Sequence, residues 1–145
     1  MGCEKKILYI DDMELCHDKM RGLVYALNNN GHLIELYHRQ TALSGIYRAK
    51  TKNIGKYCLA IVDINLDYNP ELLIWEQTTE GLDVIEAIKK RKTELRLKKP
   101  FIWAVSFNDY REQSLMAGAD RFFFKRDFFG ERGLQSLDAF LKGNN

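Results

Sequence analysis

Short apolar segments alternate along this chain with longer segments in which apolar residues recur at helical spacing. Five segments have the continuous apolar run that is typical of a buried strand, at residues 5–10, 32–37, 57–62, 101–105 and 121–124. Five others have the pattern of an amphipathic helix, at residues 13–28, 41–52, 81–97, 108–117 and 133–141. Strict alternation of this kind predicts one parallel sheet with helices on both faces, joined by right-handed crossovers.

The length of 145 residues suits one such domain and is too short for two. We therefore expect a single domain over residues 1–145 with no output domain. The cysteines Cys3, Cys16 and Cys58 are too scattered for a disulfide framework or a metal site, which predicts reduced thiols. The chain has neither an apolar run of about 18 residues nor the apolar core of a secretory signal. These features predict a cytoplasmic protein that does not contact membranes.

Polar residues follow four of the five predicted strands directly: Asp11 and Asp12, then Asp63, then Ser106, then Lys125. In open parallel sheets, ligands bind beyond the carboxyl ends of the strands, so these side chains should converge. Three neighbouring carboxylates repel one another unless a cation neutralises them, and Mg²⁺ accepts carboxylate oxygens while keeping room for waters and a phosphate. A lysine ammonium and a serine hydroxyl suit phosphoryl oxygens, and a carboxylate can be the nucleophile. The set therefore predicts magnesium-dependent phosphoryl transfer.

This ordered set of residues resembles the receiver domains of two-component response regulators. The similarity rests on residues 7–12, 60–65, 104–106 and 118–125, and it covers essentially the whole chain. It implies an α/β, flavodoxin-like, doubly wound (βα)5 fold with a five-stranded parallel sheet in the order 2-1-3-4-5. It also implies a phosphoprotein that acts as a stand-alone switch in phosphorelay signal transduction, and not an enzyme that turns over a separate substrate.

The resemblance implies a role for each acidic residue. Asp63 would be the phosphoacceptor. Asp12 and Asp63 would bind Mg²⁺ through their side chains, Asn65 through its backbone carbonyl, and Asp11 through a water molecule. The phosphoryl donor would be a sensor histidine kinase or a histidine phosphotransfer protein.

The resemblance further implies that Ser106 and Lys125 bind the oxygens of the incoming phosphoryl group. Phe122 matches the aromatic switch position of the family, whose ring turns inward when the hydroxyl residue moves toward the phosphate. The output would be contact with a downstream protein through a surface near residues 108–118 and 121–141.

Three features depart from the family pattern. Residues 66–79 form a longer connection than the family usually has there, which predicts an inserted loop that covers the site, contacts a partner or packs on neighbouring apolar surface. Arg126 stands after Lys125 where the family usually has proline, so the loop there should be set differently. Phe107 follows Ser106 where a small residue is usual, and it should crowd the entrance to the site.

Two other functions stay open. The three departures are compatible with a receiver-like docking module that acts without phosphorylation, although such a module has no need of three mutually repelling carboxylates. Residues 63–67, with a later serine and lysine, are also similar to haloacid-dehalogenase-like phosphatases, but those enzymes place their acidic pair after the lysine. The basic residues 89–92 complement the dipole at the end of a helix and lack interleaved aromatic residues, so we expect no direct contact with nucleic acid.

Overall fold

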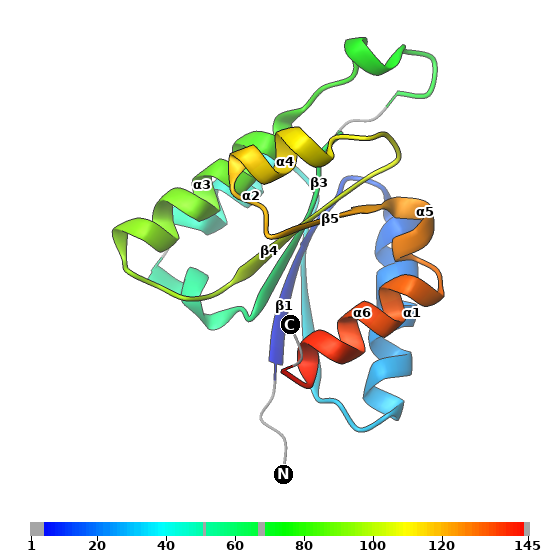
Figure 1. The fold of residues 1–145 in the computed structure, drawn as a ribbon, viewed down its shortest axis with the longest axis vertical. Coiled ribbons are helices and arrows are strands. Elements are labelled where there is room, and N and C mark those ends of the chain that lie inside the picture. The colour runs from blue at the N-terminus through cyan, green and yellow to red at the C-terminus, as the bar shows by residue number, and fades with distance from the viewer. Residues whose placement is uncertain (1–4, 51, 67–68, 144–145) are drawn as a thin grey trace.

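The computed structural model describes residues 5–50, 52–66 and 69–143 (Figure 1). Within them, five parallel strands form one sheet in the order β2-β1-β3-β4-β5, which confirms the predicted fold class and strand order. The strands are β1 (Lys5–Ile10), β2 (Ile34–Arg39), β3 (Leu59–Asp63), β4 (Phe101–Ser106) and β5 (Arg121–Phe124). Asp67, which the phosphatase hypothesis would use, and Cys3 lie outside the described residues.

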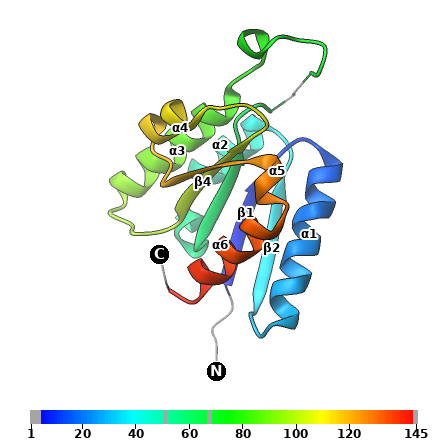
Figure 2. The same cartoon turned by 45° about the vertical axis from the view of Figure 1, so that its right-hand side comes forward.

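Helices cover both faces of the sheet (Figures 1 and 2). The α-helices are α1 (Glu14–Asn29), α2 (Ala42–Lys50), α3 (Glu80–Glu94), α4 (Arg111–Ala117), α5 (Lys125–Phe128) and α6 (Glu131–Leu141), and the 3₁₀ turns are η1 (Lys52–Lys56) and η2 (Ile74–Glu76). Helices α1, α5 and α6 lie on one face, and α2, α3 and α4 lie on the other. In the described part of the chain, no helix is long and apolar enough to cross a membrane.

Strand β1, which has a neighbour on each side, shows why the predicted strands are continuous apolar runs. Its residues Ile7 and Tyr9 pack into the core beneath α1 and α6, whereas Leu8 and Ile10 pack into the core beneath α2 and α3. All four are fully buried. Successive side chains of a strand point to opposite faces, so a strand covered on both sides must be apolar at every position.

The chain directly after β5 differs from the prediction, because the structure has a sixth α-helix there that the sequence pattern did not predict. Helix α5 begins at Lys125 itself, directly after β5. A proline at position 126 would disfavour the helical conformation for the residue before it, and Arg126 removes that restriction. Helix α2 is also shorter than predicted, since the 3₁₀ turn η1 replaces the end of the predicted segment 41–52.

The segment between β3 and α3 projects beyond the carboxyl ends of the strands in both views (Figures 1 and 2). It is longer than a simple connection and carries the 3₁₀ turn η2 near its tip. Its side chains Leu73, Ile74 and Trp75 are exposed. Of the three placements expected for this loop, packing on neighbouring apolar surface is therefore wrong for its tip.

Candidate functional site

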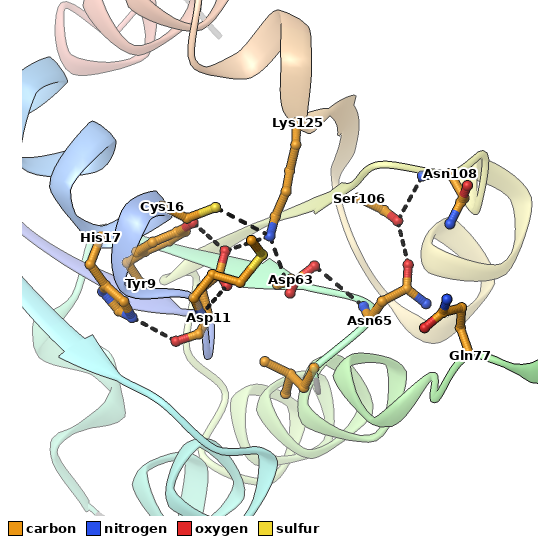
Figure 3. Close-up of polar contacts among 12 residues, drawn as sticks. Tyr9, Asp11, Cys16, His17, Asp63, Asn65, Gln77, Ser106, Asn108 and Lys125 are labelled. Atoms are coloured by element: carbon orange, nitrogen blue, oxygen red, sulfur yellow. Dashed lines mark hydrogen bonds and ion pairs between the residues drawn. The ribbon is translucent and has the colours of Figure 1, made fainter. Parts of the chain in front are cut away.

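The register of the sheet places the predicted site residues at one edge. Ile10 pairs with Val62, so Asp11 comes level with Asp63 at the ends of β1 and β3. On the other side of β3, Asp63 itself pairs with Val105, one residue before Ser106. Ser106 pairs with Phe124, one residue before Lys125. Side chains that are far apart in the sequence therefore meet at one end of the sheet (Figure 3).

Three carboxylates form a cluster at this edge. Asp11, Asp12 and Asp63 each offer an oxygen, and the three oxygens lie within 4.8 Å of one another. Asp11 and Asp63 are buried, and Asp12 is half-buried. Like charges this close in a poorly solvated site destabilise the fully ionised state unless cations neutralise them.

Lys125 supplies one such cation from within the chain. Its ammonium nitrogen lies 2.7 Å from Oδ2 of Asp11 and 3.3 Å from Oδ2 of Asp63, and its side chain is 1% exposed. Burial lowers the pKa of the Lys125 ammonium, but the carboxylates of Asp63 and Asp11 outweigh that effect and raise its pKa above the ordinary value. The lysine is therefore held as a charged group that bridges two acidic residues.

The carboxyl group of Asp63 has a higher pKa than an ordinary aspartate. Burial and the neighbouring carboxylate of Asp11 raise the pKa of Asp63 to about 7, against the opposing effect of Lys125. Oδ1 of Asp63 accepts a hydrogen bond from the backbone N–H of Asn65 at 3.3 Å. Oδ2 receives no hydrogen bond from the described residues, so it is a buried oxygen directed toward Lys125 and open to a further cation.

Unlike Asp63, Asp11 has hydrogen-bond donors from the protein on both oxygens of its carboxylate. Tyr9 donates its hydroxyl to Oδ2 at 2.5 Å, and the backbone N–H of Met13 donates to Oδ1 at 2.9 Å. The ammonium of Lys125 also contacts Oδ2. A carboxylate with three donors has little capacity left for a direct metal bond. The water-mediated role that the family resemblance implied for Asp11 stays a prediction.

The donor set fits a hard divalent cation. All the candidate side-chain ligands are carboxylate oxygens, the ligands that Mg²⁺ takes in proteins. Three carboxylates against one ammonium leave a negative excess, and the carboxylates of Asp11 and Asp12 add to the larger effect of burial in raising the pKa of Asp63. The side chains of Asp12 and Asp63 and the carbonyl of Asn65 would hold the ion. When bound, Mg²⁺ would neutralise charge on Asp63.

Ser106 lies beside the acidic cluster and is engaged elsewhere. Its hydroxyl donates to Oδ1 of Asn65 at 2.7 Å and accepts from the backbone N–H of Asn108 at 3.1 Å (Figure 3). The carboxamide of Asn65 in turn donates from Nδ2 to the backbone carbonyl of Thr78 at 2.9 Å. Asn65 thus links the end of β4 to the base of the projecting segment.

The predicted switch residue, Phe122, lies on β5 and is half-buried. It packs against the core on the α3 side of the sheet, where the Arg111 guanidinium lies 5.6 Å from its ring. The ring also contacts Phe124 edge-on, with centroids 5.3 Å apart. A switching role for Phe122 stays a prediction.

Phe107 has a definite place at the entrance. The ammonium of Lys125 lies 4.9 Å from the centre of its ring, a cation–π distance. Two adjoining hollows, of about 730 and 320 Å³, share Phe107 and Arg126 in their walls, and the second reaches Lys125. Pro70, from the projecting segment, lines the first. The site is therefore approached through a partly apolar entrance.

Four residues that the motifs did not single out shape the site. Tyr9 holds Asp11, the buried ring of His17 contacts the backbone carbonyl of Asp11 through Nε2 at 2.6 Å, and Cys16 lies 3.6 Å from the Lys125 ammonium. Gly81 packs on the backbone of β3, where a Cβ would lie 2.0 Å from the carbonyl oxygen of Asp63. The sequence could have indicated Gly81, because a glycine at the start of a predicted helix suggests a close backbone contact. Tyr9 could not be distinguished from the other apolar residues of its strand.

Comparison with known proteins finds likeness in structure alone. No model of a protein family matches the chain, and no curated protein matches it by sequence. A LuxR-family DNA-binding response regulator from Staphylococcus aureus is 17% identical over 97% of this chain and 99% of its own, with a TM-score of 0.61. A response regulator in red light signalling of R. palustris is 13% identical over 97% and 96%, with a TM-score of 0.64.

A third similar structure is the receiver domain of the histidine kinase CKI1 from Arabidopsis thaliana, in a D1050A mutant. It is 18% identical over 85% of this chain and 82% of its own, with a TM-score of 0.57. At these identities, the comparisons establish that the chain has the fold of response-regulator receiver domains. The chemistry has to be argued from the site itself.

Proposed function

We propose that this protein is a response-regulator receiver in which Asp63 accepts a phosphoryl group from the phosphohistidine of a sensor histidine kinase or a histidine phosphotransfer protein. The observation that carries the proposal is the buried Lys125 ammonium between Asp11 and Asp63, beside the third carboxylate of Asp12. An ammonium and a divalent-cation site on either side of a carboxylate are what in-line phosphoryl transfer to that carboxylate requires.

In the proposed reaction, a carboxylate oxygen of Asp63 attacks phosphorus and forms an O–P bond. The N–P bond of the phosphohistidine breaks, and its electron pair returns to the imidazole. Lys125 would stabilise charge on the phosphoryl oxygens, and its pKa, raised above the ordinary value, keeps it a cation throughout. Its bond to Asp11 sets the position of the ammonium before the donor arrives.

The response would be a shift between two conformations that exist before phosphorylation. Ser106 would leave Asn65 and donate its hydroxyl to a phosphoryl oxygen on Asp63. Phe122 and the surface formed by α4, β5 and the helices that follow would change with it, and a downstream protein would read that surface.

A docking module that acts without phosphorylation is the second candidate. The observation that favours it is Phe107, whose ring lies against the Lys125 ammonium at the entrance to the site. In such a module, the ion pairs of Lys125 would serve stability alone.

Intact mass after incubation with acetyl phosphate and Mg²⁺ distinguishes the two candidates. A receiver gains one phosphoryl group, and the Asp63→Asn variant and a sample without Mg²⁺ do not. Absence of any gain in a protein that still binds Mg²⁺ and accepts nothing from a phosphorylated histidine phosphotransfer protein would reject the receiver chemistry in favour of docking.

A further inference from the structure

The segment of residues 69–78, between β3 and α3, has a defined conformation that is held by its own hydrogen bonds. The buried side chain of Gln77 braces it from within: its carboxamide accepts a hydrogen bond from the backbone N–H of Asn69 at 3.0 Å. The same carboxamide donates to the backbone carbonyls of Asn69, at 2.5 Å, and Leu72, at 3.2 Å. A loop that is closed around one glutamine side chain can move as a unit.

The tip of this segment is strongly apolar and points to solvent. Four consecutive residues, 72–75, are Leu, Leu, Ile and Trp, and the last of them, Trp75, is 80% exposed. The other tryptophan of the chain, Trp103, is 2% exposed in the core between the sheet and α6. An exposed cluster of large apolar side chains is uncommon on a folded protein unless it has a use.

Two hydrogen-bonded connections join the segment to the end of β4, and both start at Ser106, whose bonds to Asn65 and Asn108 are drawn in Figure 3. The first is Asn65, which accepts from the Ser106 hydroxyl and donates to the carbonyl of Thr78. The second is the half-turn after Ser106: Asn108 donates its N–H to the serine oxygen, and Tyr110 donates its hydroxyl to the carbonyl of Ile74 at 3.2 Å. The base of the segment is therefore linked to Ser106 through Asn65, and its tip is linked to Ser106 through the backbone from Asn108 to Tyr110.

A serine hydroxyl has a single hydrogen, so Ser106 cannot donate to Asn65 and to a phosphoryl oxygen at once. When it turns toward a phosphorylated Asp63, the buried Oδ1 of Asn65 loses its donor, and the carboxamide that holds Thr78 has to readjust. If the backbone N–H of Asn108 keeps its hydrogen bond to the serine oxygen, the chain from Asn108 to Tyr110 is drawn toward the site with it.

We propose that residues 69–78 are a phosphorylation-responsive element, in which Asn65 and Tyr110 transmit the position of Ser106 to the apolar tip around Trp75. Asn65 and Tyr110 act as positioning residues. The inference rests on the proposed function, because phosphorylation of Asp63 is the event that moves Ser106. Inward movement of Tyr110 draws the Ile74 carbonyl toward the hollow lined by Pro70 and Phe107, so the tip becomes less accessible to solvent.

Trp75 itself is the probe for the test. Quenching of tryptophan fluorescence by acrylamide is measured on the Mg²⁺-loaded full chain before and after acetyl phosphate, with intact mass recorded on the same samples. The Trp75→Phe variant isolates the contribution of Trp103. We expect the accessible emission of Trp75 to fall in the phosphorylated protein and to stay unchanged in Asp63→Asn. A phosphoryl gain with unchanged quenching would overturn the inference and leave the proposed function standing.

Tyr110→Phe tests the route of the coupling, because it removes the hydroxyl that holds Ile74 and keeps the ring. Its phosphoryl gain should equal that of the wild type while the quenching response of Trp75 shrinks. Tyr25→Phe, at an exposed position of α1, is the matched control and should respond like the wild type. An undiminished response in Tyr110→Phe would reject the coupling through Tyr110. A wild type that gains no phosphoryl group either from acetyl phosphate or from a phosphorylated histidine phosphotransfer protein would reject the proposed function and the inference together.

Discussion

The ammonium nitrogen of Lys125 lies 2.7 Å from Oδ2 of Asp11, and both side chains are buried. This ion pair crosses the sheet edge from the end of β5 to the end of β1, and β3 and β4 lie between these two strands. Loss of one partner of a buried pair leaves an uncompensated charge, which typically costs about 3–5 kcal/mol. The pair therefore ties the stability of the domain to the integrity of the site.

Replacement Lys125→Gln should lower the free energy of unfolding by about 3–5 kcal/mol in metal-free buffer. It should also abolish phosphoryl gain from acetyl phosphate, while Mg²⁺ binding persists because the carboxylates remain. Urea denaturation and calorimetric titration with Mg²⁺ measure the two effects. Lys142→Gln is the matched control, since Lys142 pairs with Asp138 at 2.9 Å on the surface, where water screens the pair, and this replacement should change the free energy of unfolding far less. Equal stability losses in the two variants would contradict the buried-pair argument.

Gly81→Ala should disturb the site through the backbone of β3, against which Gly81 packs. The new Cβ would lie 2.0 Å from the carbonyl oxygen of Asp63 and 2.6 Å from Cα of Ile64, so the start of α3 or the end of β3 has to shift. We expect a loss of about 1–3 kcal/mol in urea unfolding, together with slower phosphorylation. Gly22→Ala, at an exposed position of α1 with open space around it, should instead gain roughly 0.5–1 kcal/mol. A neutral Gly81→Ala would show that this contact is looser than the structure has it.

Asp63 should make the metal-free protein less stable as the pH rises. Its pKa is about 7 in the folded protein and has the ordinary value of 3.8 in the unfolded chain, so between these values the native state binds more protons. Stability contributed by the protonated carboxyl is therefore lost as the pH rises through this interval. The difference in melting temperature between wild type and Asp63→Asn, measured in EDTA, should move against the wild type from pH 4 to pH 7, a range set by these two pKa values.

Addition of Mg²⁺ should reverse that trend, because the ion binds the deprotonated carboxylate. The stabilisation by Mg²⁺ is expected to be larger above the pKa of Asp63 than below it, and to be small in Asp63→Asn at every pH. A wild-type pH profile parallel to that of the variant would argue against a raised pKa for Asp63.

Tyr9→Phe should weaken the support of Asp11 without removing it. The variant loses the hydroxyl that donates to Oδ2 at 2.5 Å, while Lys125 and the N–H of Met13 still hold the carboxylate. Hydrogen bonds to charged groups contribute about 1.5–3 kcal/mol, and we expect a loss in that range in urea unfolding. Tyr47→Phe, on the exposed side of α2, provides the comparison and should be close to neutral.

The strands and the main helices followed from local patterns in the sequence. Strand β5 begins and ends at the predicted residues, and β1 does as well, because a strand buried on both faces must be apolar at each position. Helix α5 could not be predicted in this way. It has only four residues, too few for the apolar periodicity of a helix to be visible. It also depends on position 126 not being a proline.

The identity of the candidate site residues could be predicted from the sequence, but their contacts with one another could not. Asp11, Asp63 and Lys125 stand out because polar residues end otherwise apolar strands. Which carboxylate is already satisfied, and which oxygen is left for a cation, depends on Tyr9, on the turn at Met13 and on the burial of Asp63. Tyr9 and Met13 are each two residues from Asp11, but the backbone conformation and burial that turn them toward its carboxylate are set by the folded sheet.

The sequence by itself determined the doubly wound fold, the strand order implied by the family resemblance and the list of polar residues at the sheet edge. The fold class and the list of polar residues follow from periodicity and from the identity of residues at strand ends, which are local properties, whereas the strand order came from the resemblance alone. The tertiary structure alone decided that Lys125 bridges Asp11 and Asp63, that Asn65 connects Ser106 to Thr78, and that the tip around Trp75 faces solvent. Those relationships join residues from different strands and loops, so they come into being only when the register of the sheet places the ends of the strands side by side.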